Sequence, residues 1–199
     1  MEKYLVLATF VGSIIALLFA LITGKRVLSY EEGTPLMSKI SRSIREGANA
    51  YLRRQYTVVG IFFACMVVVL CVMAGCKLLT WFVPFAFLTG GFFSGLAGYI
   101  GMKTATYASG RVANACRHSL DAGLQIAFRS GAVLGLTVVG LAMLDIGVWY
   151  WVLDWFYEDM ELSMRLVVIT TTMLTFGMGA SLQALFARVG GGIFTKAAD

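Results

Sequence analysis

Long runs without a charged side chain are the feature that most constrains this chain. Residues 4–24, 56–76, 78–102 and 166–187 contain none, and a fifth run over 130–152 is interrupted only by Asp145. Each run is long enough to cross a ~30 Å hydrocarbon layer as a helix, which takes roughly 20 residues. Hydrophobic residues make up 59% of the 199-residue chain, more than a soluble core of this size holds. We therefore predict an all-α fold: a polytopic bundle of five transmembrane helices at these five runs, forming one transmembrane domain over 1–199.

Composition excludes several other classes of protein. The chain lacks the alternating ten-residue segments of an outer-membrane barrel. Its four cysteines lack CxxC spacing, which argues against a disulfide framework or a zinc site. The net charge of +5 comes from basic residues that flank the apolar runs instead of forming one stripe. We therefore expect no nucleic-acid partner.

The basic residues are distributed unequally between the two sides of the predicted membrane. Of the 16 Lys and Arg, only Lys3, Lys77 and Arg165 fall on one side. The acidic residues after the fourth run fall on that same side: Asp154, Glu158, Asp159 and Glu161. By the positive-inside rule, the N-terminus is outside and the C-terminus is cytoplasmic. We expect a multi-pass protein of a bacterial inner membrane, in contact with its lipid.

The connection between the first two runs also carries a helix signal. Thr34 before Pro35 supplies a capping hydroxyl and a preset φ at the first helical position. Apolar residues then recur at helical spacing on a strongly basic segment, at Ile40, Ile44, Ala48 and Tyr51. This pattern predicts a helix that runs on into the second span and is held at the interface against acidic lipid headgroups, with a ligand-binding role as the alternative.

Small residues recur inside the predicted spans. They include Gly91-x-x-x-Gly95, Gly131-x-x-x-Gly135 and the cluster Gly177, Gly179, Ala180 and Ser181. Such residues let helix backbones approach closely in lipid, so we expect a tight bundle. The sequence stops at Asp199 without a helix cap or tail, and we expect it to be a fragment of a longer protein.

The last run continues past the membrane as a helix with one polar face. At about 100° per residue, its polar and small residues fall within an arc of about 100°. These residues are Thr170, Gly177, Ser181, Arg188, Gly192, Thr195, Lys196 and Asp199. At about 1.5 Å per residue, Lys196 lies roughly 12 Å and Asp199 roughly 16 Å beyond Arg188. Arg188 is then expected at the inner boundary of the membrane, and the other two in water.

The chemistry of these residues suggests a magnesium–phosphate ligand. A Lys ammonium is suited to phosphate oxygens, and a carboxylate one turn away can hold Mg²⁺. The alternatives are a solvated ion pair between Lys196 and Asp199, and an Arg188 that only extends toward the headgroups. The glycines at 190–192 do not have the spacing of a phosphate-binding P-loop.

Four stretches together resemble one family. The segment Ala184-Leu185-Phe186-Ala187-Arg188-Val189-Gly190-Gly191-Gly192-Ile193-Phe194-Thr195-Lys196-Ala197-Ala198-Asp199 resembles the signature helix of the membrane-bound, ion-pumping inorganic pyrophosphatases. The segments Arg45-Glu46-Gly47-Ala48 to Tyr56, Gly110 to Ala115 and Phe128 to Val133 are similar to the same family. A departure lies at Leu182-Gln183, where the family more often has small or aliphatic residues.

The resemblance implies a function and roles for three residues. Lys196 matches a lysine that contacts pyrophosphate, Asp199 a magnesium ligand and Arg188 the arginine of an ion gate. The implied protein is a homodimeric pump that couples pyrophosphate hydrolysis to transport of H⁺ and/or Na⁺, with Mg²⁺ as cofactor and K⁺ as a further one in some members. This chain would be its N-terminal part, inactive alone.

Two readings from other classes remain open. A secondary transporter would use Arg188 for an anionic solute, and a non-enzymatic assembly subunit would need none of the three residues. Asp145 is either part of an ion exit or a partly hydrated charge at the end of a helix.

Overall fold

Five long helices form the chain. The computed structural model describes residues 2–198, with side chains for 6–196. The helices are α1 (Glu2–Leu28), α2 (Pro35–Gly75), α3 (Phe82–Cys116), α4 (Leu120–Phe156) and α5 (Leu162–Ala198), and no strand occurs among residues 2–198. Each helix is long and apolar enough to cross a membrane. The predicted all-α bundle with five membrane-spanning helices is confirmed, and the protein is a multi-pass membrane protein.

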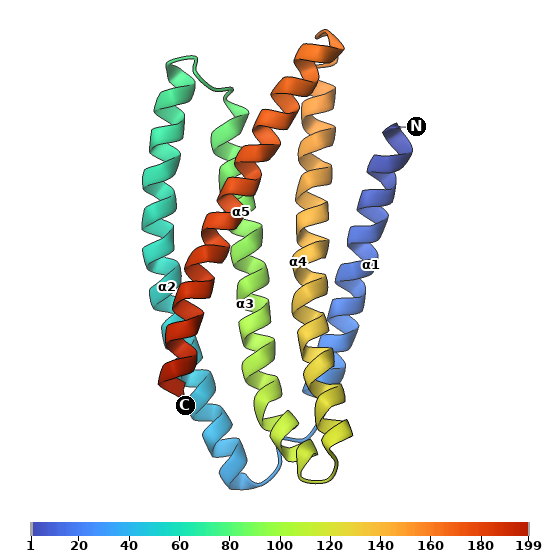
Figure 1. The fold of residues 1–199 in the computed structure, drawn as a ribbon, viewed down its shortest axis with the longest axis vertical. Coiled ribbons are helices and arrows are strands. Elements are labelled where there is room, and N and C mark those ends of the chain that lie inside the picture. Colours follow the sequence, from blue (N-terminus) through green and yellow to red (C-terminus); the bar gives the residue numbers. More distant parts are fainter. Residues whose placement is uncertain (1, 199) are drawn as a thin grey trace.

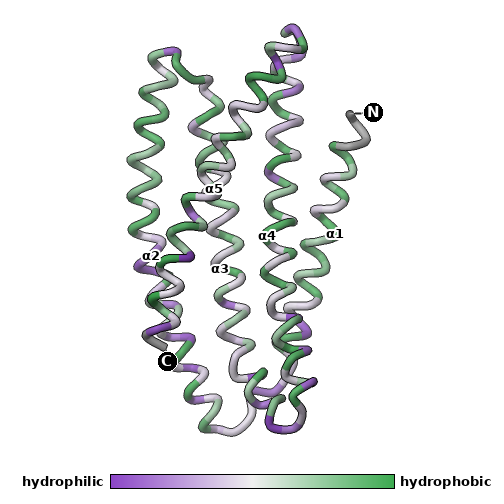
Figure 2. Tube along the Cα trace, viewed as in Figure 1, coloured by the Kyte–Doolittle hydropathy of each residue, from purple (hydrophilic) through white to green (hydrophobic). Residues whose placement is uncertain are grey.

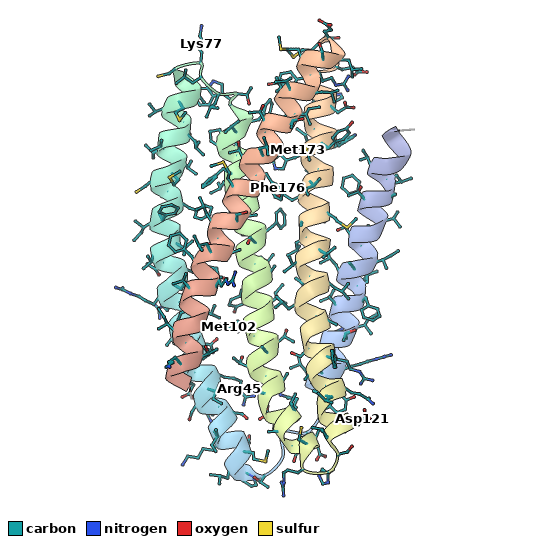
Figure 3. All side chains as sticks on the ribbon, in the orientation of Figure 1. Arg45, Lys77, Met102, Asp121, Met173 and Phe176 are labelled. Carbon is teal, nitrogen blue, oxygen red and sulfur yellow. The ribbon has the colours of Figure 1, made fainter. Side chains whose placement is uncertain are left out.

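The helices run up and down, and α5 crosses the others obliquely. α3 packs against α2, α4 and α5, while α1 packs mainly against α4 (Figure 1). α5 begins beside the end of α4, crosses α3 and ends beside α2. Hydrophilic residues are concentrated toward the ends of the bundle (Figure 2). Arg45 and Asp121 lie near the end that holds the α1–α2 and α3–α4 connections, and Lys77 lies at the other end (Figure 3).

The start of α2 is partly as predicted. Thr34 caps the helix, its hydroxyl accepting a hydrogen bond from the Met37 amide at 3.4 Å, and Pro35 is the first helical residue. The helix then continues without a break to Gly75, so its predicted run into the second span is confirmed. Its inner face is buried at Ser41, Ala48 and Leu52. Ser41 packs against α3, where a Cβ at Gly110 would lie 2.2 Å from its hydroxyl oxygen.

Small residues bring helix backbones together, but not at every predicted position. A Cβ at Gly179 would lie 2.1 Å from the Phe87 carbonyl oxygen, and one at Gly90 would lie 2.3 Å from that of Phe176, so α3 and α5 touch backbone to backbone. At Gly131, Gly135 and Gly177, by contrast, a Cβ would meet nothing within 4 Å among the described residues, so no described helix approaches closely there. The close approach of α4 to α1 instead occurs at Gly140, whose carbonyl accepts a hydrogen bond from Ser13 at 2.7 Å. A small-residue spacing does not tell which face of a helix has a neighbour.

An acidic side chain ties three helices together at the basic end of the bundle. Glu32, in the α1–α2 connection, accepts hydrogen bonds from the Arg45 guanidinium at 2.5 and 3.2 Å and lies 3.0 Å from that of Arg111. Arg111, on α3, also donates to the carbonyls of Leu28 and Tyr30 at the end of α1. Cations at a helix C-terminus satisfy its free carbonyls. The basic segments at 45 and 111 therefore have a structural function as well as a topological one.

We expect Glu32→Gln to destabilise the bundle at neutral pH by about 1.5–3 kcal/mol, the range for hydrogen bonds to charged groups. Hydrogen bonding from Arg45, with both guanidinium charges, lowers the pKa of Glu32 in the folded protein. A lowered pKa stabilises the fold above the ordinary carboxyl pKa, and this contribution is lost as pH falls through the folded-state value. Thermal unfolding in detergent across pH should show the wild type and variant converging in acid. Glu31→Gln is the control, because the Glu31 side chain is exposed.

The predicted orientation can be tested with single cysteines in a background lacking the four native ones. The α1–α2 and α4–α5 connections lie at opposite ends of the bundle (Figure 1). We expect Glu158→Cys to react with an impermeant thiol reagent in intact cells and Glu31→Cys to be protected until the cells are lysed. Both residues are exposed in the structure. The reverse labelling pattern would contradict the orientation inferred from the basic residues.

Candidate functional site

The predicted polar face of α5 is the face that α1–α4 leave uncovered. Exposed residues on it are Thr170, Ser181, Arg188, Gly192, Thr195 and Lys196. The opposite side is buried against the bundle, at Ile169, Thr172, Thr175, Gly179 and Gln183. Both sets follow helical spacing, so one continuous helix separates a packing face from an uncovered face. The uncovered face also exposes apolar side chains, at Leu174, Met178, Leu185, Val189 and Ile193.

Arg188 and Lys196 are free to contact a ligand or a further part of a larger protein. Neither side chain has a hydrogen bond or ion pair with any residue of 6–196. Lys196 lies at a shallow surface depression with Val189, Gly192 and Ile193. The two cations are about 12 Å apart along the axis, because they are eight residues apart on one helix.

The end of α5 that carries Lys196 is seated on α2 by a contact that sequence reasoning missed. The rings of Phe194 and Tyr51 stack with their centres 5.5 Å apart. A Cβ at Gly190 would lie 2.1 Å from the Tyr51 hydroxyl oxygen and 2.7 Å from Oε1 of Gln55. A larger residue at position 190 would therefore collide with the side chains of α2. Tyr51 and Gln55 lie in the family-like segment 45–56. The sequence did not show that this segment packs against α5.

The third predicted residue, Asp199, lies outside the described residues. Among the described side chains, no group of three or more His, Cys, Asp or Glu is placed to hold a metal ion. Residues 6–196 therefore do not form a magnesium site by themselves.

Asp145 differs from the partly hydrated end-charge that we considered. It is only 2% exposed, and the Thr89 hydroxyl near it donates to the Ala86 carbonyl at 3.2 Å. The Trp149 indole N–H donates to the same hydroxyl at 2.8 Å. Oδ2 of Asp145 has no hydrogen-bond partner among the described residues. This acid lies far along α4 from Arg129 and is separate from the α5 face.

The bundle is part of a multi-pass membrane protein whose fifth helix presents two exposed cations, Arg188 and Lys196, on its uncovered face. Residues 14–199 match the family described as inorganic H⁺ pyrophosphatase. The chain belongs to this family.

Curated relatives from three domains of life are similar to the chain. It is 58% identical over 192 residues to a protein of Bacteroides thetaiotaomicron named "Putative K(+)-stimulated pyrophosphate-energized sodium pump", covering 95% of this chain and 26% of the relative. It is 39% identical over 202 residues to a K(+)-insensitive pyrophosphate-energized proton pump of Methanosarcina mazei, covering 100% of this chain and 27% of the relative. It is 37% identical over 210 residues to pyrophosphate-energized membrane proton pump 3 of Arabidopsis thaliana, covering 98% and 26%. The chain thus spans about a quarter of the length of these relatives.

Proposed function

We propose that this chain is part of a membrane pump that couples hydrolysis of inorganic pyrophosphate to transport of Na⁺ or H⁺. The observation that carries the proposal is the uncovered face of α5, which presents Arg188 and Lys196 at two levels of one helix in a member of the pyrophosphatase family. The alternatives of a secondary transporter or an assembly subunit lose their support, since the match to this family extends over residues 14–199.

Lys196 is proposed to bind pyrophosphate. Hydrolysis requires neutralising a concentrated negative charge, and an ammonium without a protein partner is available for phosphate oxygens. Asp199 is proposed as one ligand of Mg²⁺, which when bound polarises the phosphoryl oxygens. The remaining ligands would come from outside the described residues.

Arg188 is proposed to act in the ion gate. It lies about 12 Å closer to the membrane centre than Lys196 on the same helix. A displacement of α5 on binding at Lys196 would therefore move Arg188 relative to whatever faces it. Phe194 stacks on Tyr51 at a position between Arg188 and Lys196, and both cations lie on one unbroken helix, which supports this coupling.

The relatives suggest the ion and the regulation. The protein at 58% identity is named as a sodium pump stimulated by K⁺, so we propose Na⁺ as the pumped ion and K⁺ as an activator. Other relatives are named K(+)-insensitive proton pumps, and these are the alternative. We also propose that the complete pump is a homodimer in the bacterial inner membrane.

The proposal is tested with the complete protein reconstituted in vesicles. Phosphate release with Mg²⁺ and pyrophosphate, and uptake of ²²Na⁺ or acidification of the lumen, are measured with and without K⁺. We expect hydrolysis to be coupled to Na⁺ uptake and raised by K⁺. The 199-residue chain purified alone should release phosphate at well below roughly 1 s⁻¹, the low end of ordinary enzyme turnover. A complete protein that hydrolyses no pyrophosphate would contradict the proposal.

A further inference from the structure

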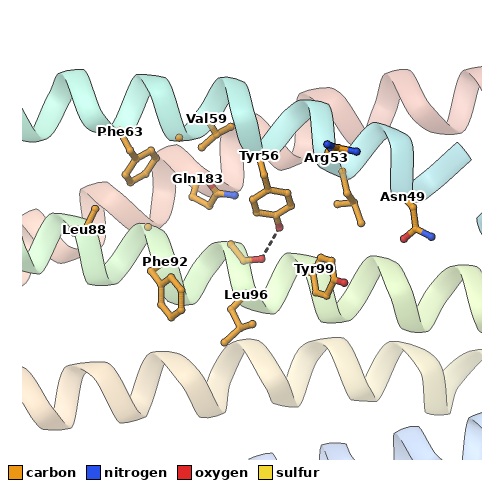
Figure 4. A pocket seen from close by; sticks show the side chains of 14 residues that line it. Asn49, Arg53, Tyr56, Val59, Phe63, Leu88, Phe92, Leu96, Tyr99 and Gln183 are labelled. Carbon is orange, nitrogen blue, oxygen red and sulfur yellow. Dashed lines mark hydrogen bonds between the residues drawn. The ribbon is translucent and has the colours of Figure 1, made fainter. Parts of the chain in front are cut away.

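A groove between α2 and α3 lies on the membrane-embedded part of the bundle. Its volume is about 630 Å³, within the range of small-molecule sites. Apolar side chains line most of it, including Val59, Phe63, Leu88 and Phe92, and Gln183 of α5 lies at its floor. Arg53 and Asn49 lie at one end and Phe63 and Leu88 at the other (Figure 4).

The length and position of the groove match one leaflet of a membrane. From Arg53 to Phe63 on α2 the axial rise is about 15 Å, and from Tyr99 to Leu88 on α3 it is about 16 Å. Half of a ~30 Å hydrocarbon layer is ~15 Å. Arg53 lies three residues before the predicted start of the second span. The groove therefore extends from the headgroup level at the basic side of the membrane to about its midplane.

The headgroup end is positively charged. Arg53 is exposed and makes no ion pair within the described part of the chain. A second cation is close, because the Lys103 ammonium lies 5.1 Å from the centre of the Tyr99 ring that lines this end. The described lining contains no acidic residue. An anionic group is the charge complement of this end.

Gln183 provides an independent sign of a ligand. It is 3% exposed, yet no residue of 6–196 forms a hydrogen bond with its amide. Neither of its amide atoms is among the fully enclosed polar atoms that lack a partner, so the amide opens onto the groove, where a ligand can bond to it. The neighbouring Tyr56 hydroxyl donates its proton to the Gly95 carbonyl at 2.6 Å and forms no hydrogen bond with Gln183 (Figure 4). Gln183 lies one turn deeper than Arg53, at the level of Tyr56, where a phospholipid carries its ester carbonyls.

We propose that this groove binds one anionic phospholipid, with the phosphate at Arg53, an ester carbonyl accepting a hydrogen bond from Gln183 and an acyl chain against Val59, Phe63 and Phe92. The site lies on a different face from Arg188 and Lys196, so it goes beyond the proposed function and does not depend on it. A lipid here would fill the space between α2 and α3 and stabilise the side of α5 that packs on both.

Binding is measured by native mass spectrometry of the complete protein, delipidated in mild detergent and titrated with phosphatidylglycerol or phosphatidylcholine. We expect one tight phosphatidylglycerol per subunit and weaker phosphatidylcholine. Arg53→Gln should weaken phosphatidylglycerol roughly fivefold or more, the effect of one basic side chain near a lipid surface. Arg54→Gln is the matched control, since Arg54 is the adjacent exposed cation but does not line the groove.

A second variant fills the groove without disturbing the fold. A Cβ at Gly60 would meet nothing within 4 Å, although Gly60 lines the groove. Gly60→Leu should therefore remove the tight binding of phosphatidylglycerol, while Gly131→Leu, on open surface of α4, should leave it intact. Equal binding of the two lipids, equal effects of the two arginine variants, or full binding by Gly60→Leu would overturn the proposal. If Gly60→Leu does not fold, the comparison of Arg53→Gln with Arg54→Gln decides the proposal.

Discussion

Lys196→Ala in the complete pump should lower kcat/KM for pyrophosphate roughly 10- to 100-fold, and ion uptake should fall in parallel. The estimate is the value of a hydrogen bond to a charged group, about 1.5–3 kcal/mol. The loss should be large because Lys196 has no partner among the described residues that would compensate for it. Phosphate release and ion uptake are measured in the same vesicles, which gives the number of ions moved per pyrophosphate.

Arg188→Ala in the complete pump distinguishes the proposed role of Arg188 in ion transport from that of Lys196 in hydrolysis. It leaves the phosphate contact in place, so we expect transport to be impaired at least as severely as hydrolysis. Thr195→Ala is the control on the same face, because the Thr195 hydroxyl only donates to the Gly192 carbonyl one turn earlier. If Arg188→Ala and Lys196→Ala both retained the rate and the ratio of the parent, the face would be structural and the proposed roles would be wrong.

The largest effect on folding is expected at the contact of α3 with α5. Gly179→Ala places a Cβ 2.1 Å from the Phe87 carbonyl oxygen and 3.2 Å from the Gly91 amide nitrogen. Backbone atoms cannot rotate away as side chains do, so the two helices must separate. We expect a loss of about 1–3 kcal/mol or more, the cost of overpacking a close contact.

Thermal unfolding of the complete protein in detergent measures this loss. Gly135→Ala is the matched control, because its Cβ would meet nothing within 4 Å. Alanine also favours a helix over glycine by up to about 1 kcal/mol, so the control should be neutral or slightly stabilising. Equal destabilisation by both variants would show that α5 does not touch α3 in this way.

The prediction of five helices succeeded because a long uncharged run in lipid must satisfy every backbone hydrogen bond within the protein. Few structures other than a helix do so. The polar face of α5 was predictable for a similar reason, since residues such as Arg188 and Lys196 share one helix and their spacing fixes their relative direction. The contacts between helices could not be predicted from the sequence. Nothing in the period of α2 or α5 indicates that Tyr51 stacks on Phe194, or that Glu32 binds Arg45 and Arg111.

The same holds for Gly131 and Gly135, which meet no close neighbour among the described residues. Small residues permit a close approach, but they do not determine where a neighbour lies. The α1 contact at Gly140 depends on the path of the whole chain, including the α1–α2 connection that Arg111 holds in place. Such long-range pairings involve residues that are about 80 or more apart in the sequence and leave no local pattern.

The oblique crossing of α5 over α3 gives the helix the geometry of a seesaw. Gly179 marks the crossing, and it is 17 residues from both Leu162 and Lys196. Each arm is therefore about 25 Å long. A rigid rod pivoting at this point moves its two ends by equal amounts in opposite directions. A tilt that draws Lys196 toward a ligand on one side of the membrane would thus swing the start of α5, near Arg165 and its partner Asp154, the opposite way on the other side.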